Sequence, residues 1–262
     1  MTKLTLAVHK FTSCDGCQLA FLNAGEKLLT LFDLTEITHF AEAGQVNLEK
    51  KVDVAIIEGS ISTPEEKIRI NKIRQNSKFV ITIGACATSG GLQALRNITN
   101  SEEWVKSIYT NPEHIKTLKT STAISEHIKV NSEIWGCPVN TEQVLDAIRS
   151  LLSNATPRIK HDSVCIECKR KGNVCVLITK KQPCMGPVTQ TGCGALCPTL
   201  GRACYACYGP KENSNSISLG RQFEKFGFKQ ESISQQFSHI NNNSIEFKKA
   251  HNHFKGIKIV KK

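Results

Sequence analysis

The residues with the most evident chemistry are twelve cysteines, which fall into three sets of four. Cys14 and Cys17 belong to a CDGC loop, whereas Cys86 and Cys137 each stand alone after a hydrophobic run. The other eight lie within 43 residues: Cys165, Cys168, Cys175, Cys184, Cys193, Cys197, Cys204 and Cys207. One cubane iron–sulfur cluster needs four thiolates, so the count predicts three clusters and a role in carrying electrons.

Composition indicates a globular chain in a reducing compartment. Of the 262 residues, 40% are hydrophobic and 22% are charged, which is ordinary for a globular protein. No run approaches the roughly 18 apolar residues of a transmembrane helix, and the N-terminus shows no signal-peptide pattern. We therefore expect a cytoplasmic protein without a membrane span. Cytoplasmic thiols are kept reduced, so clustered cysteines there favour metal or redox sites over disulfides.

The net charge of +11 (34 basic minus 23 acidic residues) raises the alternative of nucleic-acid binding. The lysines are dispersed, however, and the densest basic run, 169–171, lies among cysteines. Bound clusters would also lower the sum, because four thiolates around a cubane carry a net charge of about −1 to −2. We therefore expect no nucleic-acid partner.

Strands and helices alternate over residues 1–155. Strands are predicted at 4–9, 35–40, 52–57, 78–83 and 128–135, and helices at 19–31, 64–75 and 140–152, with a further helix starting at 90–96. Thr63 and Glu66 are expected to form a capping box around Pro64. This alternation predicts an α/β fold with a parallel sheet.

Two segments follow this domain. Residues 156–210 are rich in glycine, proline and cysteine and lack hydrophobic periodicity, so we expect bound metal to fold this cysteine-rich domain. Residues 211–262 form a polar C-terminal extension with one amphipathic helix expected at 217–227.

The first set of cysteines is expected to lie at one edge of the predicted sheet. Cys14, Cys86 and Cys137 each follow a predicted strand, and the carboxyl ends of parallel strands line a common crevice. Cys86 and Cys137 would alternatively be buried core thiols, but both lie beside glycine in loops. Glu58 opens onto the same crevice, where it would relay protons or accept hydrogen bonds from backbone amides; the alternative is a helix-capping glutamate.

The eight C-terminal cysteines have the spacings C-x2-C-x6-C-x8-C and C-x3-C-P-x5-C-x2-C. The simplest partition gives each run its own cluster, and a ligand shared between the runs stays open. Zinc is the main alternative, since zinc ribbons also use paired C-x2-C motifs, usually about 12–20 residues apart. The shorter gaps and the third pair favour iron–sulfur.

The ordered motifs resemble the small subunit of nickel–iron hydrogenases. They are CDGCQ at 14–18, EGSI at 58–61, IGACATSGG at 83–91, WGCPVN at 135–140, CIECKRKGNVC at 165–175, PCMGPVTQTGCGALCP at 183–198 and GRACYACYGP at 201–210. The resemblance covers residues 4–210 and is to the delta subunits of cytoplasmic enzymes of the sulfhydrogenase or NAD(P)-linked type.

The resemblance implies a flavodoxin-like domain followed by a cysteine-rich domain, with three 4Fe–4S clusters. By position, Cys14, Cys17, Cys86 and Cys137 would hold the proximal cluster, Cys165, Cys168, Cys175 and Cys184 the distal one, and Cys193, Cys197, Cys204 and Cys207 the medial one. Cys165 stands where periplasmic relatives have a histidine ligand, and Cys197 adds a medial cysteine that they lack. Both departures imply clusters with cysteine ligands alone.

The resemblance also implies an electron-transfer subunit, with hydrogen split at a nickel–iron centre on a separate large subunit. Electrons would pass to a flavin- or iron–sulfur-bearing reductase subunit. The direction of flow and the final acceptor stay open among NADP, NAD, polysulfide, ferredoxin and a heterodisulfide reductase. Two alternatives remain: a zinc-stabilised basic α/β binding module, and a single-cluster subunit like those of respiratory quinone reductases, against which the eight extra cysteines argue.

Overall fold

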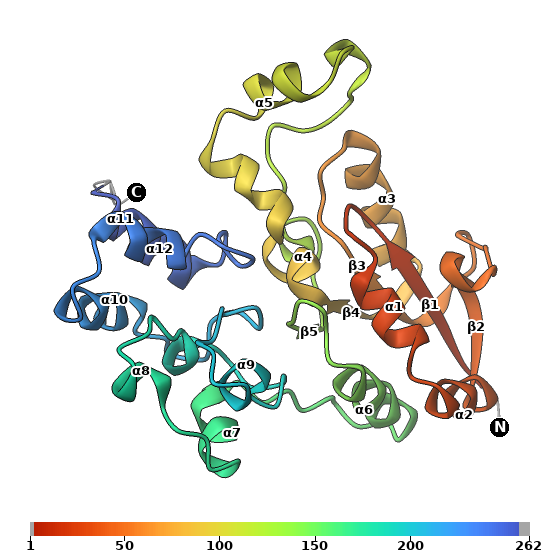
Figure 1. Ribbon diagram of the computed structural model, residues 1–262. Helices are drawn as coiled ribbons and strands as arrows, with labels where there is room; N and C mark the ends of the chain where they lie inside the picture. The colour runs from red at the N-terminus through yellow and green to blue at the C-terminus, as the bar shows by residue number, and fades with distance from the viewer. Residues whose placement is uncertain (1–2, 257–262) are drawn as a thin grey trace. The chain divides into compact units, whose positions relative to one another are not determined.

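A five-stranded parallel sheet forms the centre of the first of two units in the computed structural model, which describes residues 3–256 (Figure 1). Unit 1 is Met1–Ile159 and unit 2 is Lys160–Lys262. The strands are β1 (Leu4–Lys10), β2 (Thr35–Phe40), β3 (Val52–Glu58), β4 (Ser77–Ile83) and β5 (Ser132–Ile134). Their order is β2-β1-β3-β4-β5, the flavodoxin-like order, so the α/β prediction is confirmed.

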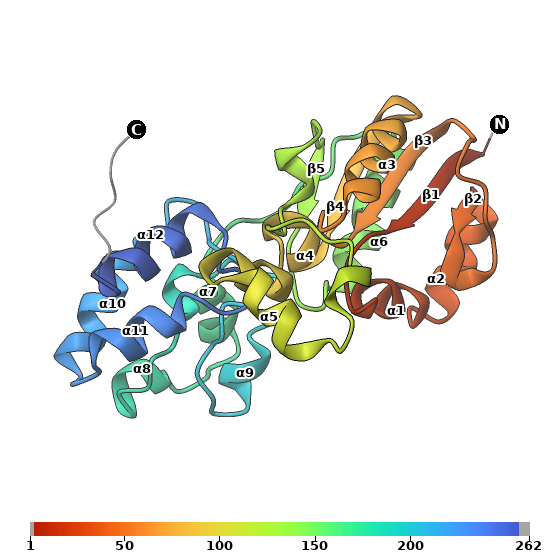
Figure 2. The same ribbon diagram turned by 90° about the horizontal axis from the view of Figure 1, so that it is seen from above.

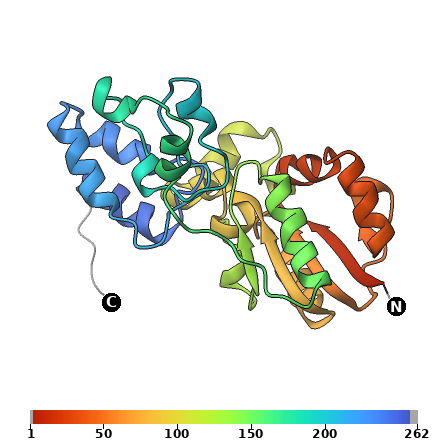
Figure 3. The same ribbon diagram turned by 90° about the horizontal axis from the view of Figure 1, so that it is seen from below.

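Helices cover both faces of this sheet. The helices of unit 1 are α1 (Gly16–Leu22), α2 (Glu26–Leu34), α3 (Pro64–Gln75), α4 (Gly84–Ser89), α5 (Ser101–Ile108), which buries none of its residues, and α6 (Thr141–Leu152). One core packs α1, α2 and α6 against one face through residues such as Phe21 and Ile148. A second core packs α3 against the other face through Ile70 and Ile73. Figure 2 shows α3 on its face, and Figure 3 shows the green helix α6 in front of the strands on the opposite face.

Side-chain alternation along β1 explains how one strand serves both cores. Leu6 and Val8 contribute to the core under α1, α2 and α6, whereas Ala7 contributes to the core under α3. Successive side chains of a strand point to opposite faces of the sheet. The buried strands β3 and β4 alternate in the same way, and therefore both faces need a helical cover.

The predicted ends of α3 and α6 are confirmed by their caps. Thr63 Oγ1 accepts the backbone N–H of Glu66 at 3.2 Å, and Glu66 Oε2 accepts the N–H of Thr63 at 3.1 Å. The Asn140 side chain caps α6 by accepting the N–H of Glu142 at 2.9 Å. Each bond satisfies a helix N–H that has no partner inside the helix.

Three predicted elements differ from the structure. The strand expected at 128–135 is shorter, because only Ser132–Ile134 (β5) pairs with β4. The single helix expected at 19–31 is instead α1 and α2, because Gly25 between them has φ +62, which lies outside the helical region. The helix expected from 90–96 is a 3-10 helix, Leu92–Ile98. The other 3-10 helices are Ala41–Ala43, Pro112–His114, Ile124–Glu126 and, in unit 2, Gly186–Val188.

Unit 2 consists of short helices joined by the cysteine-bearing loops. Its helices are α7 (Val164–Arg170), α8 (Val176–Thr179), α9 (Leu196–Thr199), α10 (Ser216–Lys225), α11 (Gln230–Gln236) and α12 (Ile245–Phe254). One core joins Val164 and Met185 from the cysteine-rich segment to Phe223, Phe237 and Phe247 from the last three helices. The structure therefore packs residues 211–256 together with the cysteine-rich segment, although the two differ in composition.

The helix expected at 217–227 corresponds to α10, whereas α11 and α12 were not predicted. Polar residues dominate this stretch, but Phe247, Ala250 and Phe254 recur at helical spacing and are all buried. This spacing is the sequence pattern from which α12 could have been predicted. Over residues 3–256, none of the helices has the length and apolar character needed to cross a membrane.

Candidate iron–sulfur sites

The first four thiols meet at the carboxyl ends of the strands of unit 1. Cys14 lies in the loop after β1, Cys17 in α1, Cys86 in α4 directly after β4, and Cys137 after β5 and before a cis peptide bond to Pro138. Cys17 interacts electrostatically with Cys86 and Cys137, and both Cys86 and Cys137 interact with Cys14. The structure therefore brings these four residues together.

Burial raises the pKa of three of these thiols. Cys17 is 7% exposed, and burial above all holds its pKa well above the usual range. Burial, with help from neighbouring Cys137, raises the pKa of Cys86 to about 12. The pKa of Cys137 is raised by burial and by Cys14. Buried thiols so close together stay neutral unless a bound cation deprotonates them, as a coordinated metal does.

Gly84 and Gly91 let the backbone lie directly against two sulfur atoms. A Cβ atom on Gly84 would lie 2.4 Å from Sγ of Cys17, and one on Gly91 would lie 2.6 Å from Sγ of Cys86. Both glycines also have positive φ, +83 and +61, which side chains disfavour. Nearby, the backbone N–H of Val139 donates to Sγ of Cys17 at 3.4 Å. Close backbone of this kind can donate N–H groups to cluster sulfur.

Glu58 ends β3 at the edge of the same crevice and is 2% exposed. Its Oε1 accepts the backbone N–H of Cys17 at 3.1 Å. Cys17 lies in the first turn of α1, so this single bond serves both as an amide contact and as a helix cap. Burial raises the pKa of Glu58, partly offset by Gln18 and by the Cys17 N–H. Its other oxygen, Oε2, has no hydrogen-bond partner among residues 3–256.

Two glutamines lie beside the thiols, and neither was among the predicted site residues. Gln18 is fully buried, and within the described residues neither amide atom makes a hydrogen bond of normal geometry, although the side chain lies beside Glu58. Gln93 accepts a hydrogen bond from Sγ of Cys86 at 3.4 Å and donates to the carbonyl of Thr12 at 3.4 Å. Their positions next to the CDGC and GG motifs are the sequence feature that could have pointed to them.

The second set of thiols gathers around α7 and α8. Cys165 and Cys168 lie in α7, Cys175 caps α8, and Cys184 lies in the next loop. Burial raises the pKa of Cys165, which also interacts with the other three thiols. Burial likewise raises the pKa of Cys184. A Cβ atom on Gly186 would lie 3.3 Å from Sγ of Cys165 and 3.4 Å from Sγ of Cys184. The structure brings these four residues together.

The third set forms two close pairs. Cys193 interacts with Cys197 in α9, and burial is the main cause of its raised pKa. Cys204 is 6% exposed, and it interacts with both Cys207 and Cys184 of the second set. The backbone N–H of Cys204 donates to Sγ of Cys184 at 3.2 Å. The two C-terminal sets are therefore adjacent, and the union of the two pairs in one site stays a prediction.

Glu167, within the CIEC motif, connects the two C-terminal sets. Its Oε1 accepts the N–H of Gly192 at 3.0 Å, and its Oε2 accepts the N–H of Ala195 at 3.2 Å. These residues flank Cys193, so the carboxylate fixes the position of that loop beside α7. Apart from the position of Glu167 between two cysteines, no sequence signal pointed to this role.

The donor set fits iron–sulfur clusters. The first two predicted sites each gather four thiols, with glycines that bring the backbone against the sulfur atoms, and the third offers two pairs of thiols. Four thiolates are the ligand chemistry of a cubane. Among the described residues, no three His, Cys, Asp or Glu side chains are arranged to hold a single metal ion.

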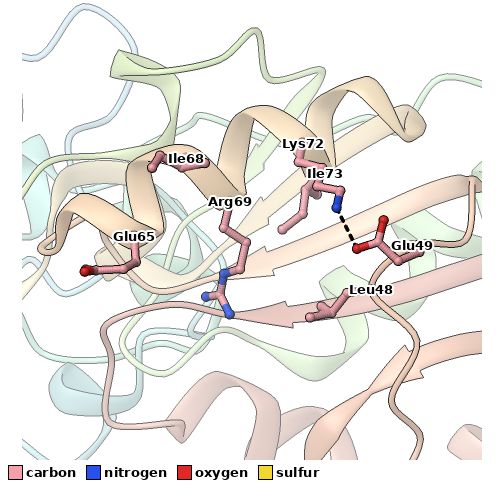
Figure 4. Close-up of a pocket in the computed structure, with 7 residues that line it drawn as sticks. All are labelled: Leu48, Glu49, Glu65, Ile68, Arg69, Lys72 and Ile73. Carbon is pink, nitrogen blue, oxygen red and sulfur yellow. Dashed lines mark hydrogen bonds and ion pairs between the residues drawn. The ribbon is translucent and has the colours of Figure 1, made fainter.

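A groove of about 370 Å³ in unit 1 is separate from the thiols (Figure 4). It lies between α3 and the segment that joins β2 to β3. Its lining residues are Leu48, Glu49, Glu65, Ile68, Arg69, Lys72 and Ile73. An ion pair of 2.6 Å joins Lys72 to Glu49 at one end, and the Arg69 guanidinium lies 4.1 Å from the centre of the Phe11 ring. No cysteine lines this groove.

Comparison with known proteins gives consistent matches. Residues 14–151 match the family model described as "NADH ubiquinone oxidoreductase, 20 Kd subunit". Sulfhydrogenase 2 subunit delta of Pyrococcus furiosus is 35% identical over 212 residues, covering 81% of this chain and 89% of that protein. A subunit of the F420-non-reducing hydrogenase vhu from Methanocaldococcus jannaschii is 31% identical over 250 residues, covering 83% of this chain and 86% of that protein.

A solved structure also shares the fold. One chain of the crystal structure of the NAD+-reducing nickel–iron hydrogenase in its H2-reduced state superposes with a TM-score of 0.56 at 23% identity. The match covers 60% of this chain and 96% of that chain.

Proposed function

This chain belongs to the family of the NADH ubiquinone oxidoreductase 20 kDa subunit, and on that basis we propose that it is the electron-transfer small subunit of a cytoplasmic nickel–iron hydrogenase. Its similarity to hydrogenase subunits over about four fifths of its length supports this assignment within the family. The single observation that carries the proposal is the gathering of thiols at both units, four at the strand ends of unit 1 and the rest in unit 2.

Three 4Fe–4S clusters are proposed. Cys14, Cys17, Cys86 and Cys137 hold the proximal cluster, Cys165, Cys168, Cys175 and Cys184 the distal one, and Cys193, Cys197, Cys204 and Cys207 the medial one. When bound, the clusters would exchange single electrons between the nickel–iron site of a large subunit and a flavin- or iron–sulfur-bearing reductase subunit. The side chains and backbone of this chain bind the clusters, shield them from water and adjust their electronic environment.

In unit 1, the proposed proximal site is buried at Cys17 and open at Cys14, which is exposed. Cys17 is nearly inaccessible and receives a hydrogen bond from Val139. Glu58 holds the N–H of Cys17 and thereby fixes the CDGC loop. A proton-relay role for Glu58 remains part of the proposal, supported by its burial and by the free Oε2 atom among the described residues.

Matched serine variants test the medial assignment. Cys197→Ser should lower the iron content of the hydrogenase complex by up to about four atoms and alter its EPR spectrum, because a cubane needs four thiolates. Leu200→Ser is the control, since Leu200 lies directly after α9 and is 70% exposed. Unchanged iron content and EPR signals in Cys197→Ser would remove Cys197 from the proposed ligands.

The zinc-stabilised binding module is the second candidate, and metal analysis separates the two. Brown protein with iron and acid-labile sulfide supports electron transfer, whereas colourless protein with zinc would reject it. The family membership and the hydrogenase relatives favour the iron–sulfur assignment.

A further inference from the structure

Unit 2 exposes apolar and basic side chains on the same three short helices and the loops after them, a surface that we call the α7–α9 face. Its exposed apolar residues are Ile166, Val174, Ile178, Leu196, Leu200 and Tyr205. Its exposed basic residues are Lys169, Arg170, Lys171, Lys180, Lys181 and Arg202. All twelve come from α7, α8, α9 and the loops that follow these helices. Scattered single apolar residues need no explanation, but a set confined to neighbouring short helices does.

Contacts between these helices make the surface continuous. The Asn173 side chain, between α7 and α8, donates to Oγ1 of Thr199 in α9 at 3.1 Å. Nζ of Lys171 lies 3.4 Å from the position of a Cβ atom on Gly194, in the loop before α9. Lys180 extends in the same way toward the loop after α9. Lysines from α7 and α8 therefore lie beside both ends of α9.

Apart from the proposed clusters, few groups in its own segment oppose the positive charge of this face. Between residues 160 and 210 the only carboxylates are Asp162 and Glu167, and both oxygens of Glu167 already accept backbone N–H groups. Across the described residues, the ion pairs all join residues between 10 and 149. These exposed cations are therefore available to pair with carboxylates of a partner protein.

The same face lies over thiols of both C-terminal sets. Cys175 is exposed, and Cys168 and Cys197 are half-buried. A recess of about 290 Å³, lined in part by Arg202 and Tyr205, borders Cys204. A protein seated on this face would lie close to cysteines of each set, and electron transfer requires such closeness.

We propose that the α7–α9 face is the docking site of an acidic electron-carrier protein, whose redox centre lies beneath an apolar spot ringed by carboxylates. The inference rests on the proposed electron-transfer role and adds the chemistry of the partner. An apolar centre with a charged rim is the usual anatomy of a protein interface. Rim charges of opposite sign steer the partner and set its orientation.

A binding experiment tests the proposal on the complex of this chain with its large subunit, separated from the reductase subunit, with an acidic plant-type ferredoxin as the probe. The variant combines Lys169→Glu, Lys171→Glu and Lys180→Glu. We expect its Kd for the ferredoxin to rise at least about tenfold at low ionic strength, because reversed rim charges repel the probe. The wild-type Kd should also rise steeply with salt, since such contacts are screened.

A control variant carries the same change of charge elsewhere in unit 2. It combines Lys248→Glu, Lys249→Glu and Lys255→Glu, three exposed lysines of α12 and the residue after it. Figures 1 and 2 show α12 on the other side of unit 2 from α8 and α9. We expect the Kd to change less than about twofold. Equal effects of the two triple variants would overturn the proposal.

Two further measurements separate the possible failures. The first measurement uses a short DNA duplex in place of ferredoxin. If the duplex binds as tightly as ferredoxin and the α7–α9 variant loses this binding, the partner is a nucleic acid and the proposal of a protein partner is overturned. Hydrogen-dependent reduction of benzyl viologen, a small cation that needs no docking surface, should stay at the wild-type rate in the α7–α9 variant. If the α7–α9 variant reduces viologen at the normal rate and also binds ferredoxin with an unchanged Kd, the docking proposal is wrong but the electron-transfer role stands. If wild-type complex cannot reduce viologen, the electron-transfer role itself fails.

Discussion

The two units hold their thiols in different surroundings. In unit 1 the sheet and its helices form two apolar cores to which only Cys17 contributes among the cysteines. In unit 2 the core includes Cys184 and Cys204, and Cys168 and Cys193 pack against it. The cores of unit 1 therefore form almost without cysteine, and most of its thiols lie at the edge of the sheet. In unit 2, cysteines are part of the core itself.

Surface charge differs in the same direction. Ion pairs join charged residues throughout unit 1, as in Lys78 with Asp53 and Lys10 with Asp15. The basic residues around α7, α8 and α9 have no such partners among the described residues. Unit 1 thus has cores that depend little on cysteine and several internal ion pairs. Unit 2 is the part for which we propose bound clusters inside and a protein partner at the surface.

The largest predicted effect is that removal of iron destabilises the cysteine-rich segment of unit 2 far more than the sheet of unit 1. Amide hydrogen exchange in residues 160–210 should accelerate by more than about a hundredfold, because metal binding supplies folding free energy where the ligands form the structure. Exchange in β1, β3 and β4 should change less than about threefold. Mass-spectrometric exchange on iron-loaded and iron-free chain measures both. Equal protection of residues 160–210 in the two forms would contradict the contrast.

The sequence allowed much of unit 1 to be predicted. Buried apolar runs such as Val52–Glu58 indicated parallel strands, and strand ends then placed Cys14, Cys86 and Cys137 at one edge. Local rules sufficed there, because periodicity, capping residues and topology all pointed to the same fold.

Unit 2 could be predicted less well, because its packing depends on contacts distant in sequence. The bond from Cys204 to Cys184 and the bonds from Glu167 to the loop before α9 have no local signal. Helices α11 and α12 were missed since polar residues surround their few buried apolar positions. The glutamine beside Cys86, Gln93, was missed for a related reason: its role depends on tertiary contact.

Alanine substitution at glycine sharpens the description of the unit 1 crevice. Gly84→Ala should destabilise unit 1 by about 2–5 kcal/mol, because the new Cβ would meet Cys17 Sγ at 2.4 Å and the backbone has φ +83. Gly44→Ala is the matched control: Gly44 has φ +80 in the left-handed helical region and nothing within 4 Å of an added Cβ, so about 1–2 kcal/mol is expected.

Tryptophan fluorescence during urea unfolding measures this difference, because both tryptophans, Trp104 and Trp135, lie in unit 1. An equal loss of stability in the two alanine variants would mean that the Cys17 sulfur does not restrict the backbone at Gly84.

A smaller effect concerns the acid stability of unit 1. Burial above all, with His39 and Arg69, lowers the pKa of His9 to about 3 from 6.5. Below pH 6.5, His9 is therefore protonated in the unfolded chain but remains neutral in the folded chain. His9 stabilises the fold fully above pH 6.5, and this contribution is lost as the pH falls toward 3. Between pH 6.5 and 4.5 the loss should be about 2 kcal/mol.

The variant His9→Phe keeps a ring against His39, from which the His9 ring centre lies 4.7 Å away, but it cannot take up a proton. Iron-free His9→Phe should therefore lose about 2 kcal/mol less than iron-free wild type over the same pH interval. Urea unfolding followed by tryptophan fluorescence at each pH gives the comparison. Parallel pH profiles would show that His9 titrates alike in the folded and unfolded chain.

The most direct test of the whole account is the metal content of the anaerobically prepared chain, measured by native mass spectrometry with elemental analysis. Three cubanes predict about twelve irons and about twelve acid-labile sulfides for each chain, and no zinc. About four irons would allow only one cluster and would contradict the three-cluster account. Zinc in place of iron would contradict the electron-transfer account altogether.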